Sequence, residues 1–220
     1  MKLLLESGKH VLCEKPLTMN RRDTEEICKI AREKKLFLME ALWSRYLPAH
    51  LQMEEAIKSG LIGEPRYVHS TMGGPIRGLE RVFRKELGGS VLLDIGCYCT
   101  SLALQVFGAE TPLKVSAYGE LGTEGVDQHV AVVMEFNGGR LATFAVSGLV
   151  KMPCKAEIVG TKGTITLHPP FHAATCIEML SRKVDAPFPR VSSPLNFVNS
   201  TGMRYEAEEV RRSLREETCQ

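Results

Sequence analysis

The sequence predicts an α/β segment followed by an α+β domain. The first forty residues alternate helix and strand patterns, which is typical of a doubly wound parallel sheet. The later residues form a run of short strands around one long apolar helix. An Asn137-Gly138 turn joins two of those strands and indicates antiparallel pairing. We therefore expect one domain over residues 1–42 and a second over residues 43–220.

The first domain begins on the last turn of a helix, which Gly8 ends in the left-handed conformation that glycine tolerates best. Ile27, Ile30 and Ala31 recur at helical spacing between charges and predict an amphipathic helix. Short apolar runs flank that helix and predict buried parallel strands. The expected elements are a helix end over 1–8, a strand over 10–13, a helix over 21–35 and a strand over 36–39.

The second domain combines helices with a mostly antiparallel sheet, and the long helix is expected to pack on one face of that open sheet. Pro48 and Gly60 bracket one helix. The longest apolar helix begins near Gly89 and ends at Gly108. A Pro/Ser/Asn-rich loop over 187–199 precedes a charged helix over 203–215. The expected strands cover residues 66–72, 115–119, 129–136, 141–147, 156–160, 164–167 and 177–181.

Composition places the chain among ordinary globular domains. It has 220 residues, of which 44% are hydrophobic and 25% charged, and a net charge of +2. Nucleic-acid-binding proteins usually carry a concentrated basic excess, so we expect no nucleic-acid partner. Uninterrupted apolar runs fall short of the roughly 20 residues that cross a bilayer, so we expect no membrane partner.

Seven cysteines, an odd number, indicate reduced thiols and a cytoplasmic location. Cys97 and Cys99 form a C-x-C pair. A zinc site needs two further ligands at short spacing, and none lies nearby in the sequence, so we expect no metal. The cysteines are at positions 13, 28, 97, 99, 154, 176 and 219.

Two stretches carry residues suited to proton chemistry. Lys15 follows a predicted buried strand, where loss of hydration disfavours an ammonium unless a partner holds it. Asp94 and Tyr98 are four residues apart, which on a helix places a carboxylate and a phenol on one face. An ammonium near that phenol would favour the phenolate, which could exchange a proton as a hydride leaves an alcohol carbon.

Each of these features also has a plain structural explanation. A lysine at a strand end is often simply solvated, and an Asp94–Tyr98 pair is a common helix-surface pair. Trp43 fits a core residue and Arg45 a surface cation. Residue spacing alone therefore predicts an α/β protein with a candidate site, and no more.

Four motifs resemble one known family. In this order and spacing they are similar to the NAD(P)-dependent oxidoreductases related to glucose–fructose oxidoreductase and inositol dehydrogenase, the Gfo/Idh/MocA family. The similarity extends from residue 1 to about residue 215, and it implies that residues 1–42 are the C-terminal remnant of a Rossmann domain. The motifs are G-K-H-V-L-C-E-K-P, M-E-A-L-W-S-R-Y, L-L-D-I-G-C-Y-C and V-G-T-K-G-T-I.

The resemblance implies a catalytic set of three residues. Tyr98 matches the tyrosine proposed as general acid/base and substrate anchor in one branch of the family, whereas most relatives in the wider superfamily have histidine at this position. Lys15 matches the lysine beside the nicotinamide ribose and the reacting carbon. Asp94 matches an acidic residue near that lysine and the coenzyme.

The resemblance also implies cofactor and substrate contacts. Glu14 and Pro16 complete the lysine motif and shape the nicotinamide end of the site. Trp43 matches an aromatic residue of the active-site wall, which would contact substrate together with Tyr98, and Arg45 matches a residue close to the cofactor. The expected cofactor-binding residues are therefore Glu14, Lys15, Pro16, Trp43, Arg45 and Asp94.

By resemblance, the expected function is that of an NADP-dependent dehydrogenase, with NAD the less favoured cofactor. The expected substrates are small molecules, namely trans-dihydrodiols oxidised to catechols or D-xylose oxidised to its lactone. The family also implies a two-fold homodimer through the open sheet of the second domain. Without a partner, such an exposed sheet face would be prone to nonspecific association.

The sequence departs from the family at one important point. The Gly-rich turn that places the pyrophosphate at a helix N-terminus is absent from the 220 residues, so we expect most of the nucleotide-binding half to be missing. The alternative function is accordingly that of a truncated, non-catalytic isoform that retains only the sheet dimerisation domain.

Overall fold

The computed structural model describes residues 1–197 and 199–216. The chain divides into two compact units, one formed by Met1–Tyr46 together with the segment from Arg190 onward, and the other by Leu47–Pro189. Within the first unit, helix α6 (Met203–Arg215) packs against the 3-10 turn η1 (Trp43–Tyr46). The expected division between residues 42 and 43 stays a prediction.

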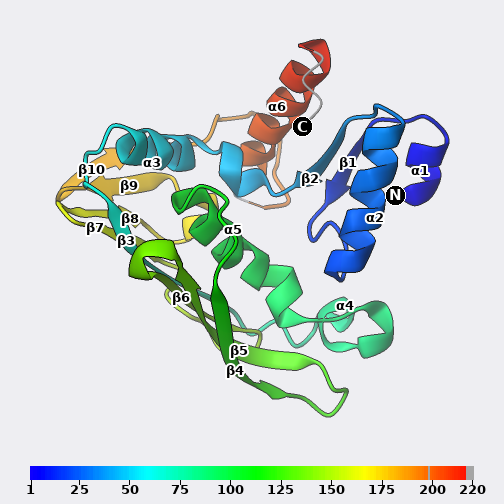
Figure 1. The fold of residues 1–220 in the computed structure, drawn as a ribbon, viewed down its shortest axis with the longest axis horizontal. Helices are drawn as coiled ribbons and strands as arrows, with labels where there is room; N and C mark the ends of the chain where they lie inside the picture. The colour runs from blue at the N-terminus through cyan, green and yellow to red at the C-terminus, as the bar shows by residue number, and fades with distance from the viewer. Residues whose placement is uncertain (198, 217–220) are drawn as a thin grey trace. The chain divides into compact units, whose positions relative to one another are not determined.

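The first unit contains a two-stranded parallel sheet with helices, as the alternating pattern predicts (Figure 1). Strand β1 pairs with β2 in a register that places Val11 opposite Leu38 and Glu14 opposite Ala41. Asn20 caps helix α2 by accepting a hydrogen bond from the backbone of Asp23. The elements are α1 (Lys2–Glu6), β1 (Val11–Glu14), α2 (Arg21–Glu33) and β2 (Leu38–Ala41), and the buried core is Leu5, Val11, Ile27 and Ala31.

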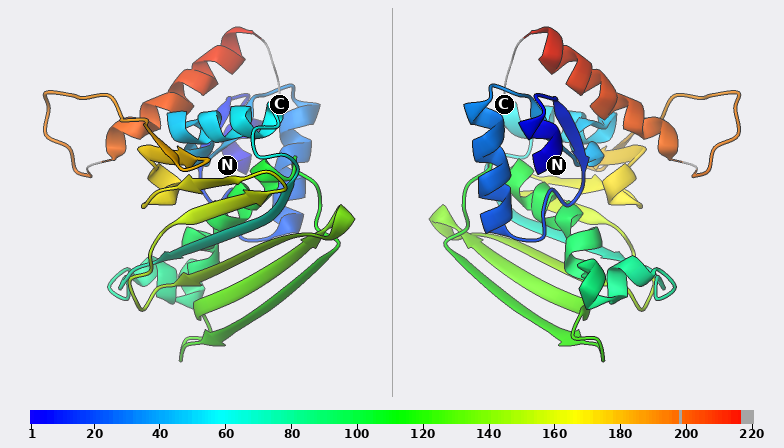
Figure 2. Two further views of the ribbon diagram at one scale, coloured as in Figure 1. Left: turned by 90° about the vertical axis from the view of Figure 1, so that its left-hand side faces the viewer. Right: turned by 90° about the vertical axis from the view of Figure 1, so that its right-hand side faces the viewer.

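The second unit is built on one eight-stranded sheet, which Figure 2 shows as a single curved layer. The strand order is β10-β9-β8-β7-β3-β6-β5-β4, and every neighbouring pair is antiparallel except β3 and β6. This confirms the mostly antiparallel sheet. The strands are β3 (Pro65–Gly73), β4 (Lys114–Leu121), β5 (Asp127–Phe136), β6 (Arg140–Ser147), β7 (Ala156–Gly160), β8 (Thr164–Leu167), β9 (Cys176–Met179) and β10 (Arg182–Asp185).

Helices of the second unit pack on one face of this sheet. Helix α5 (Cys97–Val106) contacts β3, and α3 (Pro48–Lys58) contacts both α5 and β9 (Figure 2). The alternation of strand residues follows from this packing, because Val132 and Met134 point into the core while Val133 between them is exposed. The expected long helix on an open sheet is thus confirmed.

Three local features refine the expectations. The expected hairpin at Asn137-Gly138 is confirmed, since β5 and β6 pair antiparallel, and its loop is the three-residue turn η4 (Asn137–Gly139), in which Gly138 and Gly139 adopt positive φ. The expected strand over 177–181 is present as β9 but ends at Met179. Leu180 and Ser181, both at positive φ, form a turn into a further strand, β10, which was not expected. A π-helical turn, η3 (Leu92–Gly96), precedes α5 where a regular helix was expected.

One helical stretch, Lys85–Val106, is 22 residues long and passes the test of length and hydropathy for a membrane span. Counting uninterrupted apolar runs did not predict it. Its most apolar window is 44% buried within the protein, and core helices of water-soluble domains pass the same test.

Candidate functional site

The E-K-P loop leaves the carboxyl end of β1 in the first unit. Lys15 is half-buried, and its peptide bond to Pro16 is cis. The next backbone N–H, that of Leu17, donates to Oε1 of Glu40 on β2 at 2.7 Å. Because β1 and β2 are parallel, their carboxyl ends meet at one edge, which is where α/β sheets bind nucleotides. Glu40 therefore holds the loop that carries Lys15 at this edge.

Trp43 and Arg45 lie in turn η1, directly after β2. Trp43 is buried, as expected of a core aromatic residue, whereas Arg45 is exposed. The hydroxyl of Tyr46 donates to Sδ of Met39 at 3.2 Å, and burial raises the pKa of Tyr46. The turn is thus anchored to β2 through Tyr46.

A buried carboxyl group on α6 was not predicted from the sequence. Glu206 is only 6% exposed, and its Oε2 has no hydrogen-bond partner among the described residues. Burial, together with the nearby charge of Glu14, raises the pKa of Glu206 to about 7. The sequence signal that could have found it is the spacing of Glu206, three residues after Met203 and four before Val210, because a glutamate on the apolar face of an amphipathic helix is unusual.

Asp94 and Tyr98 belong to the second unit, at the junction of the π-turn η3 with α5. Tyr98 is 8% exposed and the side chain of Asp94 13% exposed, so neither fits the alternative of a helix-surface pair. Arg81 from helix α4 (Glu80–Phe83) donates to Oδ1 of Asp94 at 2.8 Å, an ion pair that the sequence did not reveal. π-Turns inside helices are frequent at functional sites, which agrees with the candidate role of this stretch.

His172 lies against Tyr98 in the second unit, and the sequence analysis did not single it out. The centroids of the two rings are 5.0 Å apart, and the planes are tilted by 38°. His172 is carried by the 3-10 turn η5 (Phe171–Ala173). Only the fold brings this histidine, 74 positions further along the chain, to the candidate tyrosine.

A buried histidine anchors the same turn. His50 on α3 is 2% exposed, and its Nε2 donates to the carbonyl of Phe171 at 2.9 Å. Its Nδ1 lies 3.2 Å from Oε1 of Gln105 on α5, and the amide of Gln105 donates to Glu54 at 2.7 Å. This network ties η5, and with it His172, to helices α3 and α5.

The described cysteines are all free thiols. Burial raises the pKa of Cys99 to about 12, so this thiol is protonated and unreactive at neutral pH. Cys219 lies outside the described residues. The expected residues Lys15, Trp43 and Arg45 thus belong to the first unit and Asp94 and Tyr98 to the second, and the proximity of Lys15 to Tyr98 stays a prediction.

Comparison with known families gives two matches that together cover most of the chain. Residues 1–42 match an oxidoreductase family with an NAD-binding Rossmann fold, and residues 50–166 match the GFO/IDH/MocA C-terminal domain. The E-K-P motif falls within the first match, and Asp94 and Tyr98 fall within the second.

Individual proteins agree with these matches. The chain is 40% identical over 212 residues to trans-1,2-dihydrobenzene-1,2-diol dehydrogenase from Danio rerio, covering 96% of this chain and 64% of that protein. The chain therefore spans somewhat less than two thirds of the length of this relative.

Two solved structures show the same fold at low sequence identity. An NAD-binding oxidoreductase from Klebsiella pneumoniae superposes with a TM-score of 0.80 at 21% identity, over 96% of this chain and 65% of that one. A 3-ketoreductase from Actinomadura kijaniata, solved in complex with NADP, superposes with a TM-score of 0.80 at 22% identity. The superposition covers 98% of this chain and 66% of the ketoreductase chain.

Proposed function

Because this chain belongs to the GFO/IDH/MocA oxidoreductase family, we propose that it works as part of an NAD(P)-dependent dehydrogenase acting on a small hydroxylated substrate. One observation carries the proposal. Lys15 lies within the residues that match the NAD-binding Rossmann family, and Asp94 and Tyr98 lie within those that match the C-terminal domain, which supports assigning these three residues to one catalytic set.

The residues of the first unit fit the nicotinamide end of a dinucleotide. Two parallel strands end side by side, and Glu14, the half-buried Lys15 and Glu40 gather at that edge. Such an edge is the usual nucleotide-binding position of an open α/β sheet. When bound, the nicotinamide accepts or donates a hydride.

The proposed reaction oxidises a secondary alcohol. Tyr98 takes the proton of the substrate hydroxyl, and the C–H bond breaks with its electron pair leaving as hydride, which the bound nicotinamide would accept. The carbon of a dihydrodiol becomes a ketone, which gives the catechol by a proton shift, and the anomeric carbon of D-xylose becomes the lactone carbonyl. In this proposal Lys15 stabilises the phenolate of Tyr98, and Asp94, whose Oδ1 also pairs with Arg81, holds the lysine. Burial of Tyr98 against His172 limits the rotation of the phenol, which keeps the hydroxyl oriented.

The substrate class is the finer part of the proposal. The named relative acts, by its name, on trans-1,2-dihydrobenzene-1,2-diol. We propose a trans-dihydrodiol, oxidised to the catechol, as the substrate and D-xylose, oxidised to the lactone, as a second one. We propose NADP as the cofactor, as in the solved ketoreductase, while NAD remains the second candidate.

The test is the rate at which reduced cofactor forms with each substrate and each nucleotide. Tyr98→Phe should lower turnover by about 10²–10⁴-fold, because a positioned general base is lost. Tyr118→Phe, which removes the hydroxyl of a tyrosine that is 82% exposed on β4, is the matched control and should leave turnover unchanged. Turnover by Tyr98→Phe close to that of the unmodified chain would refute the acid/base role.

The alternative, a non-catalytic product that associates through its sheet, predicts a different result. A titration of the 220-residue chain with NADPH, followed by fluorescence of the nucleotide, separates the two. Sub-micromolar binding contradicts the non-catalytic alternative. Little or no binding, together with absent turnover, supports it.

We also propose that two copies associate through the open face of the sheet. Supporting this, the face opposite α5 carries exposed apolar side chains on several strands, among them Val133 on β5, Leu141 on the adjacent β6, and Val159 on β7, which β3 separates from β6. Burying such a patch in a two-fold interface removes apolar surface from water.

A further inference from the structure

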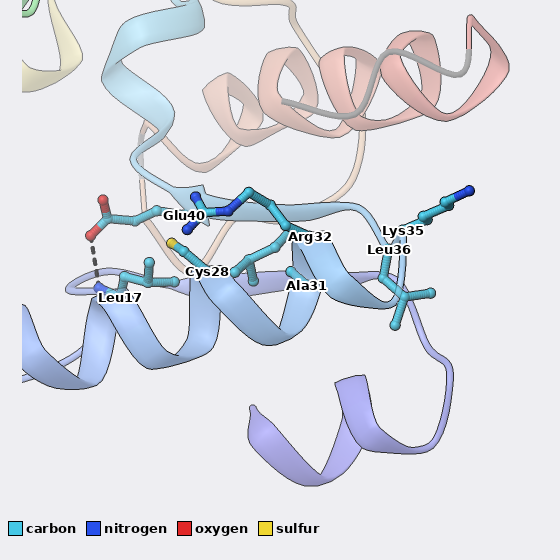
Figure 3. A pocket seen from close by; sticks show the side chains of 8 residues that line it. Leu17, Cys28, Ala31, Arg32, Lys35, Leu36 and Glu40 are labelled. Atoms are coloured by element: carbon cyan, nitrogen blue, oxygen red, sulfur yellow. Dashed lines mark hydrogen bonds between the residues drawn. The ribbon is translucent and has the colours of Figure 1, made fainter.

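Apolar surface is accessible in both units of the chain. In the first unit, it lines a pocket of about 490 Å³ between α2 and β2. Figure 3 shows that the two cations of the lining, Arg32 and Lys35, extend in opposite directions, so no pair of charges specifies a ligand there. In the second unit, by contrast, strand β4 combines exposed apolar side chains with two opposite charges.

Strand β4 is the last strand of the eight-stranded sheet, and in the part of the chain that the structure describes it pairs only with β5 (Figure 1). One side of the strand therefore offers its backbone N–H and C=O groups to a further strand. Seven of its eight residues are exposed. They include three large hydrophobic residues, Val115, Tyr118 and Leu121, with exposed fractions of 55%, 82% and 66%.

The opposite edge of the sheet is built differently. Strand β10 has four residues, and three of them are charged, namely Arg182, Lys183 and Asp185. Short and highly charged edges resist pairing with other chains. Strand β4 is twice as long and carries only Lys114 and Glu120 as charges, and its register shift lies at the far end, after Glu120. It therefore lacks most of the features that keep an edge strand unpaired.

The two charges of β4 indicate which strand would fit. Side chains alternate between the two faces of a strand, so Lys114 and Glu120, six residues apart, lie on the same face. This is the open face, because Ser116 between them is opposite Val133. In an antiparallel pair of two β4 strands centred on Ala117, Lys114 of each copy lies opposite Glu120 of the other. Opposite charges at such positions stabilise the pair.

Both charges also have neighbours within their own sheet. Lys114 is opposite Glu135 of β5, and Oε2 of Glu120 is 3.6 Å from Nε2 of His129. The side chain of Glu120 is nevertheless 65% exposed. Pairing of two β4 strands would extend an alternating row of charges, in which Lys114 of one copy stands between Glu135 of its own sheet and Glu120 of the other copy.

The same register matches large side chains with small ones. Tyr118 would lie opposite Ser116 on the open face, and Val115 opposite Gly119 on the face that carries the helices. A shift of the strands by two residues in either direction separates the opposite charges. Charge and size therefore favour one register and one occupant, a second copy of this chain.

We propose that β4 is an interface between two copies of this chain, in which the β4 strands pair antiparallel about Ala117 and the two sheets continue into each other. This edge contact is separate from the association through the open face, and it does not depend on the dehydrogenase function. A single strand pair offers less contact area than the roughly 1,200–2,000 Å² of stable complexes. We therefore expect a weak contact that forms mainly in concentrated protein.

Backbone hydrogen exchange distinguishes the edge contact from contact through the sheet face, because only strand pairing gives acceptors to the outward N–H groups of β4. The measurement compares dilute with concentrated 220-residue chain. We expect residues 114–121 to exchange more slowly in concentrated protein, while β10 is unchanged. Equal exchange of β4 at both concentrations would overturn the proposal. Protection of β10 together with β4 would indicate pairing between these two strands and would also overturn it.

Charge variants test the register. Lys114→Glu places like charges opposite each other at two symmetric positions, and Glu120→Lys does the same, so each variant alone should weaken the edge association by about tenfold. An equimolar mixture of the two variants restores opposite charges at both positions and should associate at least as well as the unmodified chain. Sedimentation velocity measures all these samples. Lys183→Glu, on the other edge strand, is the matched control and should leave the association unchanged.

The mixture also controls for folding, since two variants that failed to fold could not restore each other's association. The proposal is overturned if either single variant associates as tightly as the unmodified chain. It is equally overturned if the mixture associates no better than the single variants.

Discussion

The rings of Tyr98 and His172 lie 5.0 Å apart and pack against each other, although the two residues come from a helix and from a turn far along the chain. The carbonyl of Phe171, the neighbouring residue, accepts a hydrogen bond from the buried His50. Tyr98 therefore packs against turn η5, which the hydrogen bond from His50 anchors. Its orientation is a property of the packed unit and can be tested by changing either histidine.

Removing the His172 ring should destabilise the second unit. Aromatic pairs contribute about 0.5–1.5 kcal/mol beyond area burial, so His172→Ala should lower the free energy of unfolding by at least that amount. His172→Phe keeps a ring against Tyr98 and should recover most of the loss. Urea unfolding at neutral pH measures both variants. Equal stabilities for the two would show that the ring contact does not hold Tyr98.

Replacing His50 should loosen turn η5. His50→Leu fills a similar volume but leaves the carbonyl of Phe171 without this donor, which costs about 1–3 kcal/mol. Leu51→Ala on the same helix serves as the control, because Leu51 is half exposed and its loss should matter little. Unfolding curves of both variants make the comparison. A His50→Leu loss no larger than that of the control would contradict the anchoring role.

The stability of the first unit should fall as pH rises through neutrality. The pKa of Glu206 is raised from 4.5 to about 7 in the folded chain, so between these values the folded state binds a proton that the unfolded state releases. The contribution of Glu206 to the free energy of unfolding is therefore largest below pH 4.5, the pKa of this group in the unfolded chain. It declines as the pH rises and is lost once the pH passes about 7, the pKa in the folded chain. Hydrogen exchange of the α6 amides, measured between about pH 5 and pH 8, should show decreasing protection.

Glu206→Gln is the control for this pH dependence. The amide has a similar shape but no charge to lose, so α6 should keep nearly constant protection over the same pH range, after correction for the intrinsic exchange rate. The groups around Glu206 include Glu14 and Tyr46, and the pKa of Tyr46 is raised, so the tyrosine stays protonated throughout. A pH dependence that survives in Glu206→Gln would assign it to another group.

Charges on the open sheet face should prevent the proposed dimer. Val133→Lys together with Leu141→Lys places two like charges in the apolar patch, and sedimentation velocity should then show monomer where the unmodified chain shows dimer. Val191→Lys, at an exposed position in the first unit, should not alter the association. Dimers that persist in the double variant would locate the interface elsewhere.

Local sequence was sufficient for most elements of the fold. Gly8, Gly60 and Gly108 end their helices at positive φ, as expected, because glycine alone adopts that conformation without cost. The expected helix over 203–215 coincides with α6. The π-turn before α5 and the separate strand β10 were missed, since neither has a strong pattern of its own and both depend on packing.

The candidate site was only half visible in the sequence. Lys15, Asp94 and Tyr98 stand in motifs that can be matched one by one. Arg81 and His172 cannot be found in this way, because each reaches its partner only through the fold.

The sequence by itself determined the family, the order of elements and the chemical types in the site, because periodicity, turn residues and motifs are local properties of the chain. Tertiary structure decided which other side chains surround the candidate site residues. It placed His172 on Tyr98, paired Arg81 with Asp94 and buried the carboxyl group of Glu206. Contacts of this kind depend on packing between segments that are distant in sequence. Local patterns of residues do not specify which distant side chains will meet.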